Sequence, residues 1–124
     1  MKILHINLKK EYFEEIKSGK KTLEYRLKTD FWKKRLINRE YDEVHFKCGY
    51  PKEDDTSKII RKEYIGYREI GIRHKHFNNT GATDPQVEVF AIHTTGEEII
   101  WENGLKKKFT TWLKIKVKQK KISH

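Results

Sequence analysis

The sequence predicts a small α+β domain, a mixed β-barrel with one or two short helices near its N-terminus. Short segments that alternate apolar and polar residues dominate the chain, and this period of two is typical of strands with one buried face. One segment near the N-terminus has helical spacing instead. Two glycines, Gly66 and Gly71, interrupt a long apolar stretch, as bulges or sharp bends of a small barrel do. The length of 124 residues fits one domain.

The first half of the chain contains the predicted helices. Residues 2–6 form a short, apolar-rich strand candidate. Residues 8–18 place apolar side chains at helical spacing, and Gly19 fits the position that follows a helix C-terminus. Residues 22–27 alternate and predict a strand, after which Asp30 is expected to cap a second short helix.

The remaining strands are predicted from apolar alternation and from β-branched and aromatic content, at residues 43–50, 59–72, 86–94, 97–101 and 111–118. Thr95 and Gly96 fit the turn of a hairpin between two of these segments. Cys48 alternates with core residues of its strand, which predicts a buried, inert thiol rather than a nucleophile.

Composition indicates a folded, basic protein of a reducing compartment. Leu, Ile, Val and Phe account for 31 residues, a share above the level of roughly 20% that signals disorder. The single cysteine excludes an internal disulfide framework. Since no apolar run is long enough for a membrane span and the first residues do not have the pattern of a signal peptide, we expect a cytoplasmic location.

The charge balance favours a phosphate-bearing partner. Lys and Arg number 28 against 18 acidic residues, which gives a formal net charge of +10. Nucleic acid is favoured over a membrane, because no long basic amphipathic helix is visible. Lys106–Lys108 and the alternating lysines at 114–120 would add a basic face on the last strand.

The chemistry-bearing residues concentrate in residues 18–26, Ser-Gly-Lys-Lys-Thr-Leu-Glu-Tyr-Arg. After the helix, the strand presents Thr22, Glu24 and Arg26 on one face. Neighbours on one strand face lie roughly 6.5–7 Å apart, so Glu24 and Arg26 either form an ion pair or both contact one ligand. The Gly-Lys-x-Thr string lacks the upstream glycine of a phosphate-binding loop and follows a helix instead of a strand, which argues against a nucleoside triphosphatase.

This region resembles the ASCH family, small domains of the PUA-like β-barrel superfamily whose hallmark is a Gly-x-Lys-x-x-Glu-x-Arg string. The string maps onto Gly19, Lys21, Glu24 and Arg26. Residues 41–50 and 88–94 resemble later strands of the family, the second of them followed by a Gly-Glu turn. The resemblance covers about residues 3–100 and implies a PUA-like fold.

The family resemblance also implies a function. It implies a cleft beside the helix-to-strand junction that holds RNA or a nucleoside. Some members are ribonucleases, and one branch resembles amidohydrolases that act on acylated cytidine through a lysine, a threonine nucleophile and an assisting glutamate. Lys21 matches that lysine, whereas Glu24 stands at the nucleophile position and Thr22 is the alternative nucleophile. The assisting glutamate would be Glu63, Glu69 or Glu88.

Three hypotheses follow. The first is a module that binds RNA or a modified nucleotide on a floor of Lys21, Glu24 and Arg26; further contacts are predicted at Lys47, Tyr50 and Arg73. The second is a small metal-independent ribonuclease or nucleoside amidohydrolase in which Lys21 is the base and Glu24 a second acid–base group. The third is a basic scaffold for a protein partner. No cofactor or metal is expected, because the pair His74 and His76 lacks the further ligands of a zinc site.

Overall fold

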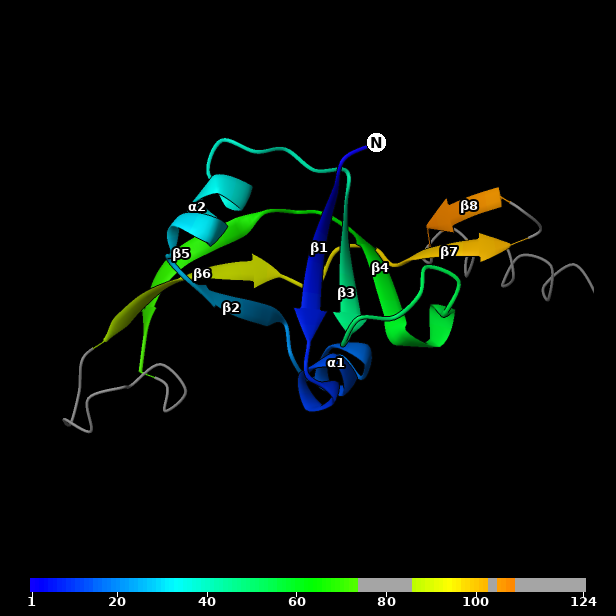
Figure 1. Ribbon diagram of the computed structural model, residues 1–124, viewed down its shortest axis with the longest axis horizontal. Coiled ribbons are helices and arrows are strands. Elements are labelled where there is room, and N and C mark those ends of the chain that lie inside the picture. Colours follow the sequence, from blue (N-terminus) through cyan, green and yellow to red (C-terminus); the bar gives the residue numbers. More distant parts are fainter. Residues whose placement is uncertain (74–85, 103–104, 109–124) are drawn as a thin grey trace, which may run out of the picture.

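A computed structural model describes residues 1–73, 86–102 and 105–108 (Figure 1). The elements run in the order β1 (Ile3–Leu8), α1 (Lys10–Lys17), β2 (Leu23–Leu27), α2 (Asp30–Leu36), β3 (Glu43–Cys48), the 3-10 turn η1 (Thr56–Lys58), β4 (Ile59–Glu63), β5 (Tyr67–Ile72), β6 (Val87–His93), β7 (Ile99–Glu102) and β8 (Leu105–Lys108). The α+β class and the two N-terminal helices are confirmed. The predicted strand 111–118 and the pair His74 and His76 lie outside the described residues.

The described strands form two three-stranded sheets and one hairpin. One sheet has the order β1-β3-β4, the other has the order β2-β6-β5, and β7 pairs with β8. Strands β1 and β3 are parallel, and the connection that this pairing requires contains α1, β2 and α2; the other pairs in both sheets are antiparallel. These sheets do not close into a barrel within the described part of the chain.

One bent segment connects the two sheets. Strands β4 and β5 are separated by three residues, and Gly66 among them has a φ of +97°. Only glycine adopts this backbone conformation without strain. Figure 1 shows the segment passing from the sheet of β1 to the sheet of β6. The bend predicted at Gly66 is therefore confirmed, whereas Gly71 lies inside β5.

The core fills the space between the sheets and α1. Every second residue of β1 is buried, and Ile6 is paired in register with Phe46 of β3. In β6, four consecutive residues from Val89 to Ile92 are buried, as expected for a strand that is covered on both faces. Phe13 and Ile16 extend from α1 into the same cluster. The helix forms because its apolar residues share one face, and it ends before Gly19, whose φ is +82°.

Some local predictions are wrong. The second helix is capped by Thr29 and not by Asp30, because the Thr29 side chain accepts a hydrogen bond from the Trp32 amide at 3.3 Å. Thr95 and Gly96 do not form the turn of a hairpin between β6 and β7. Instead, the chain after them pairs with β4 through a bridge between Lys62 and Glu98, and β7 pairs with β8.

Neither helix in the described ranges combines the length and the apolar character that a membrane span requires.

Cys48 is a free thiol, but it is only half-buried at the end of β3, where it packs against the core. The predicted burial of Cys48 is therefore only partial.

Candidate functional site

The connection between α1 and β2 places Lys21 at the edge of the second sheet. The Lys21 amide donates a hydrogen bond to the carbonyl of Glu15 in α1 at 3.0 Å. On its other side, the Thr94 hydroxyl donates to the Lys21 carbonyl at 2.9 Å, and Thr94 is buried. These two hydrogen bonds fix the backbone of Lys21 and therefore the position from which its side chain extends.

The Lys21 side chain lies among aromatic rings. Its Nζ is 5.3 Å from the ring centroid of Tyr12 in α1 and 5.2 Å from that of Tyr25 in β2. A cation at this distance from a ring is attracted by the electrons of the ring face. The ammonium group is thus held over two rings that belong to different elements.

Glu24 is the buried acid of this site. The residue is only 4% exposed, and its Oε1 accepts a hydrogen bond from Arg26 Nη1 at 2.9 Å. Burial raises the pKa of the Glu24 carboxyl, and the charges of Arg26 and Lys21 offset part of this rise. Within the described part of the chain, Oε2 is buried and accepts no hydrogen bond. Such an acceptor destabilises the folded state unless it binds a proton, water or a ligand.

Arg26 connects β2 to the end of β1. Besides the ion pair, its guanidinium donates to the carbonyl of Asn7 at 3.0 Å and to the carbonyl of Tyr25 at 3.1 Å. Its Cζ lies 5.3 Å from the ring centroid of Trp32 in α2. The Arg26 side chain is still 21% exposed, so part of the guanidinium can meet a ligand. Of the two arrangements predicted for Glu24 and Arg26, the structure forms the ion pair.

A cleft of about 320 Å³ opens beside Arg26, between β2 and α2. It is lined by Tyr25, Arg26, Leu27, Thr29, Phe31 and Trp32. Phe31 is 52% exposed, contacts Trp32 edge-on at 5.2 Å, and has the Cζ of Arg35 at 3.3 Å from its ring centroid. Exposed rings beside guanidinium groups are a surface on which a flat, electron-rich ring can stack.

Other predicted site residues lie elsewhere. Thr22 is exposed in the connection before β2. Lys47 pairs in register with Asn7, and its charge lowers the pKa of His5, after the larger effect of burial. It therefore belongs to the face of the first sheet that points away from the core. Tyr50, after β3, is 93% exposed, and Arg73 is exposed at the end of β5.

That outer face carries a buried histidine. His45 is 8% exposed, and its Nε2 lies 2.9 Å from Glu43 Oε1. Burial, together with the charges of Arg61 and Lys47, lowers the pKa of His45 to about 4. The ring of His5 packs edge-on against the ring of His45, with the ring centroids 5.5 Å apart.

No group of three or more potential metal ligands occurs among the described residues.

Sequence reasoning found the charged residues of the site but missed the aromatic ones. In the sequence, Tyr12 and Trp32 are visible only as apolar positions of two helical segments, and Tyr25 only as a position on the apolar face of a strand. The contact of these rings with the cations depends on how α1 and α2 pack on β2. The hydrophobic period of one helix or strand does not predict how it packs on another. The alternation of Glu24, Tyr25 and Arg26 was the one feature of the sequence that indicated an aromatic ring next to the charged residues of the site.

Comparison with protein-family models, with curated proteins and with solved structures found no match. The resemblance to the ASCH family therefore stays a prediction made from the sequence. The chemistry of the site is inferred from its own residues.

Proposed function

We propose that this chain is an ASCH-type, PUA-like module that binds single-stranded RNA or a modified nucleotide around Lys21, Glu24 and Arg26. The observation that carries the proposal is the cleft of about 320 Å³ beside Arg26, where the half-buried ring of Trp32 contacts the Arg26 guanidinium and the exposed ring of Phe31 contacts that of Arg35. This combination fits nucleic acid, because a base stacks on the rings and the adjacent phosphates bind the cations. A location in a reducing compartment, such as the cytoplasm, belongs to the same proposal.

The roles of the three motif residues differ in this proposal. Glu24 positions Arg26 through the ion pair, because its own oxygens are buried. Arg26 offers the exposed part of its guanidinium at the mouth of the cleft. Lys21, held over Tyr12 and Tyr25, supplies a second positive charge for a phosphate or a carbonyl oxygen.

The test is fluorescence anisotropy with a labelled single-stranded RNA of ten nucleotides and a matched duplex. We expect Phe31→Ala to weaken binding of the single strand by roughly 5- to 100-fold, since stacking on an aromatic ring contributes about 1–3 kcal/mol per base. Phe31 is half exposed, so its loss leaves the core intact. The matched control is Ile65→Ala, another exposed apolar residue. Equal dissociation constants for both variants and the unmodified protein would overturn the proposal.

A second candidate function, metal-independent hydrolysis, is favoured by one observation. The raised pKa of Glu24 beside Lys21 fits an acid–base pair. This reading predicts that RNA is cleaved, or an acylated cytidine hydrolysed, in the presence of a chelator. Both reactions should be lost in Lys21→Ala while the protein stays folded. Binding of RNA without any product supports the binding module alone.

A further inference from the structure

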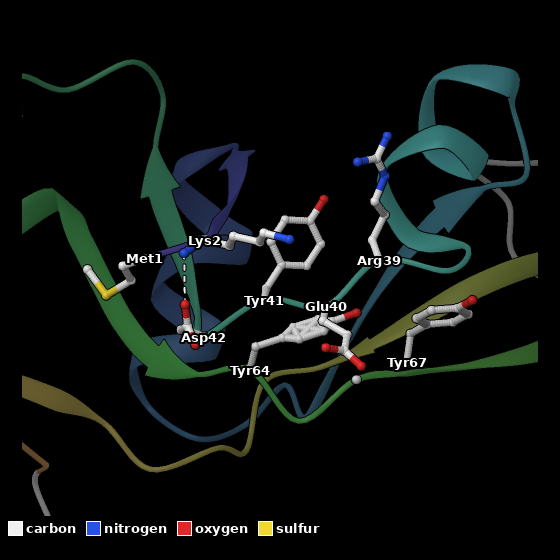
Figure 2. A pocket seen from close by; sticks show the side chains of 9 residues that line it. Met1, Lys2, Arg39, Glu40, Tyr41, Asp42, Tyr64 and Tyr67 are labelled. Atoms are coloured by element: carbon white, nitrogen blue, oxygen red, sulfur yellow. Dashed lines mark hydrogen bonds between the residues drawn. The ribbon is translucent and has the colours of Figure 1, made fainter.

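A second, larger cleft lies at the other end of β1. Its volume is about 770 Å³, and it is lined by Met1, Lys2, Arg39, Glu40, Tyr41, Asp42, Tyr64, Gly66 and Tyr67 (Figure 2). Small-molecule sites have volumes of roughly 300–1,000 Å³. Lys2 precedes β1, and Asn7, which binds Arg26, lies near the end of this strand, so these two residues are roughly 16 Å apart along β1.

Tyrosine rings form the walls of this cleft. Tyr41 and Tyr64 contact one another at a centroid distance of 5.3 Å and an angle of 39°. Tyr67 packs edge-on against Phe90 of the core at 5.3 Å, which fixes its position. Tyr64 and Tyr67 flank the bend at Gly66 in the chain. A side chain at Gly66 would meet no atom within 4 Å, so the space beside this glycine is open.

The charges at the rim select the kind of ligand. Lys2 and Arg39 are exposed there, and the Nε of Arg39 donates to the Lys34 carbonyl at 3.1 Å, so its terminal nitrogens are the groups that can meet a ligand. Of the two acids, Asp42 is engaged, since it accepts a hydrogen bond from the Lys2 amide at 2.8 Å. Glu40 is exposed, and its carboxylate lies between Tyr64 and Tyr67 in Figure 2. Because two cations and two acids line the cleft, it is the net charge of +10 on the whole chain that disfavours a cationic ligand and favours an anion, and the tyrosine rings favour an anion that carries a flat ring.

We propose that this cleft is a second nucleotide site, in which a base stacks on the tyrosines and its phosphate binds Lys2 and Arg39. Glu40 selects bases whose edge carries several N–H donors. Guanine offers adjacent ring and amino donors to one carboxylate, whereas uracil offers a single ring N–H. The site therefore prefers guanine nucleotides. This proposal does not depend on RNA binding at Lys21.

The test is a titration of the full chain, labelled in its tyrosine rings, followed by nuclear magnetic resonance. The probes are guanosine monophosphate, uridine monophosphate, ribose 5-phosphate and inorganic phosphate. Tyr64→Phe and Tyr67→Phe assign the signals. We expect guanosine monophosphate to shift both rings, uridine monophosphate to bind more weakly, and the two probes without a base to leave the rings unchanged. A dinucleotide with a guanine distinguishes an RNA segment from a free nucleotide as the source.

Variants on the rim make the test specific. Arg39→Ala should weaken guanosine monophosphate about tenfold, because it removes one charged contact to phosphate. Glu40→Gln should remove the preference over uridine monophosphate. Lys58→Ala, which removes an exposed lysine of η1, should change neither. Absence of ring shifts at millimolar nucleotide, or equal binding of ribose 5-phosphate, would overturn the proposal. Loss of the shifts in Lys21→Ala would also overturn it, since the nucleotide would then occupy the motif site.

Discussion

Glu24 combines a buried carboxyl with two neighbouring cations, and its titration should be visible in the stability of the protein. Burial raises the pKa of this carboxyl above the value of 4.5 of an ordinary glutamate. The folded state therefore holds the proton to higher pH than the unfolded state. The contribution of Glu24 to the free energy of unfolding is fully present below pH 4.5 and is lost as pH rises through the raised pKa.

Glu24→Gln removes this titration but keeps an oxygen for Arg26. We therefore predict that the free energy of unfolding of the unmodified protein, relative to the Gln variant, decreases as the pH rises from 4 towards 7. The measurement is denaturant unfolding of both proteins at several pH values. Glu69→Gln, at an exposed carboxylate, is the matched control. A difference that stays constant over this range, or increases, would contradict the raised pKa.

The contributions of Glu24 and Arg26 to the free energy of unfolding should be coupled. Arg26→Ala leaves the buried Glu24 without its partner and frees the Asn7 carbonyl, so we predict a loss of roughly 1–3 kcal/mol in the free energy of unfolding. In the Glu24→Gln background the same change should cost less, because no buried charge is then left alone. Additive effects in this double-mutant cycle would show that the two side chains are energetically independent.

For single residues, the sequence predicts which side chains share a strand face better than it predicts how deeply each of them is buried. The strand period correctly placed Glu24 and Arg26 on one face, and the ion pair is one of the two arrangements that their spacing allows. Alternation also places His45 opposite Val44 and Phe46, a position typical of a solvent-facing side chain, yet His45 is buried. A period of two separates the two faces of a strand, but it does not show which faces other segments cover.

The bend between β4 and β5 is the element on which both the fold and the second cleft depend. Gly66 has a φ of +97°, and a Cβ there meets no neighbour, so any cost of a side chain comes from the backbone alone. We predict that Gly66→Ala lowers the free energy of unfolding by about 1–3 kcal/mol. Ile65→Ala, at the adjacent exposed residue, should change it by less than about 0.5 kcal/mol. Thermal or urea unfolding of the two variants compares them directly.

The elements themselves were largely predictable. Gly19 marked the end of α1, and Gly66 marked the bend, because both positions need a backbone that other residues adopt only with strain. The pairing of the elements was not predictable. Thr95 and Gly96 have the sequence of a hairpin turn, yet residues 97 and 98 pair with β4, a partner more than thirty residues away. Local turn chemistry does not encode such a distant partner.

For the whole molecule, the net charge of +10 turns the proposed function into a prediction about salt. Each phosphate contacted by a lysine or arginine releases bound counterions, so the logarithm of the affinity for a single strand falls with the logarithm of salt concentration by roughly 0.7 per contact. Lys21→Ala should therefore weaken RNA binding at low salt and also reduce this slope by roughly 0.7. Lys58→Ala removes the same charge far along the chain from the motif, and it should leave the slope unchanged. Binding isotherms at four salt concentrations suffice. Equal slopes for the two variants would mean that the general positive field holds the RNA, and that Lys21 contacts no phosphate.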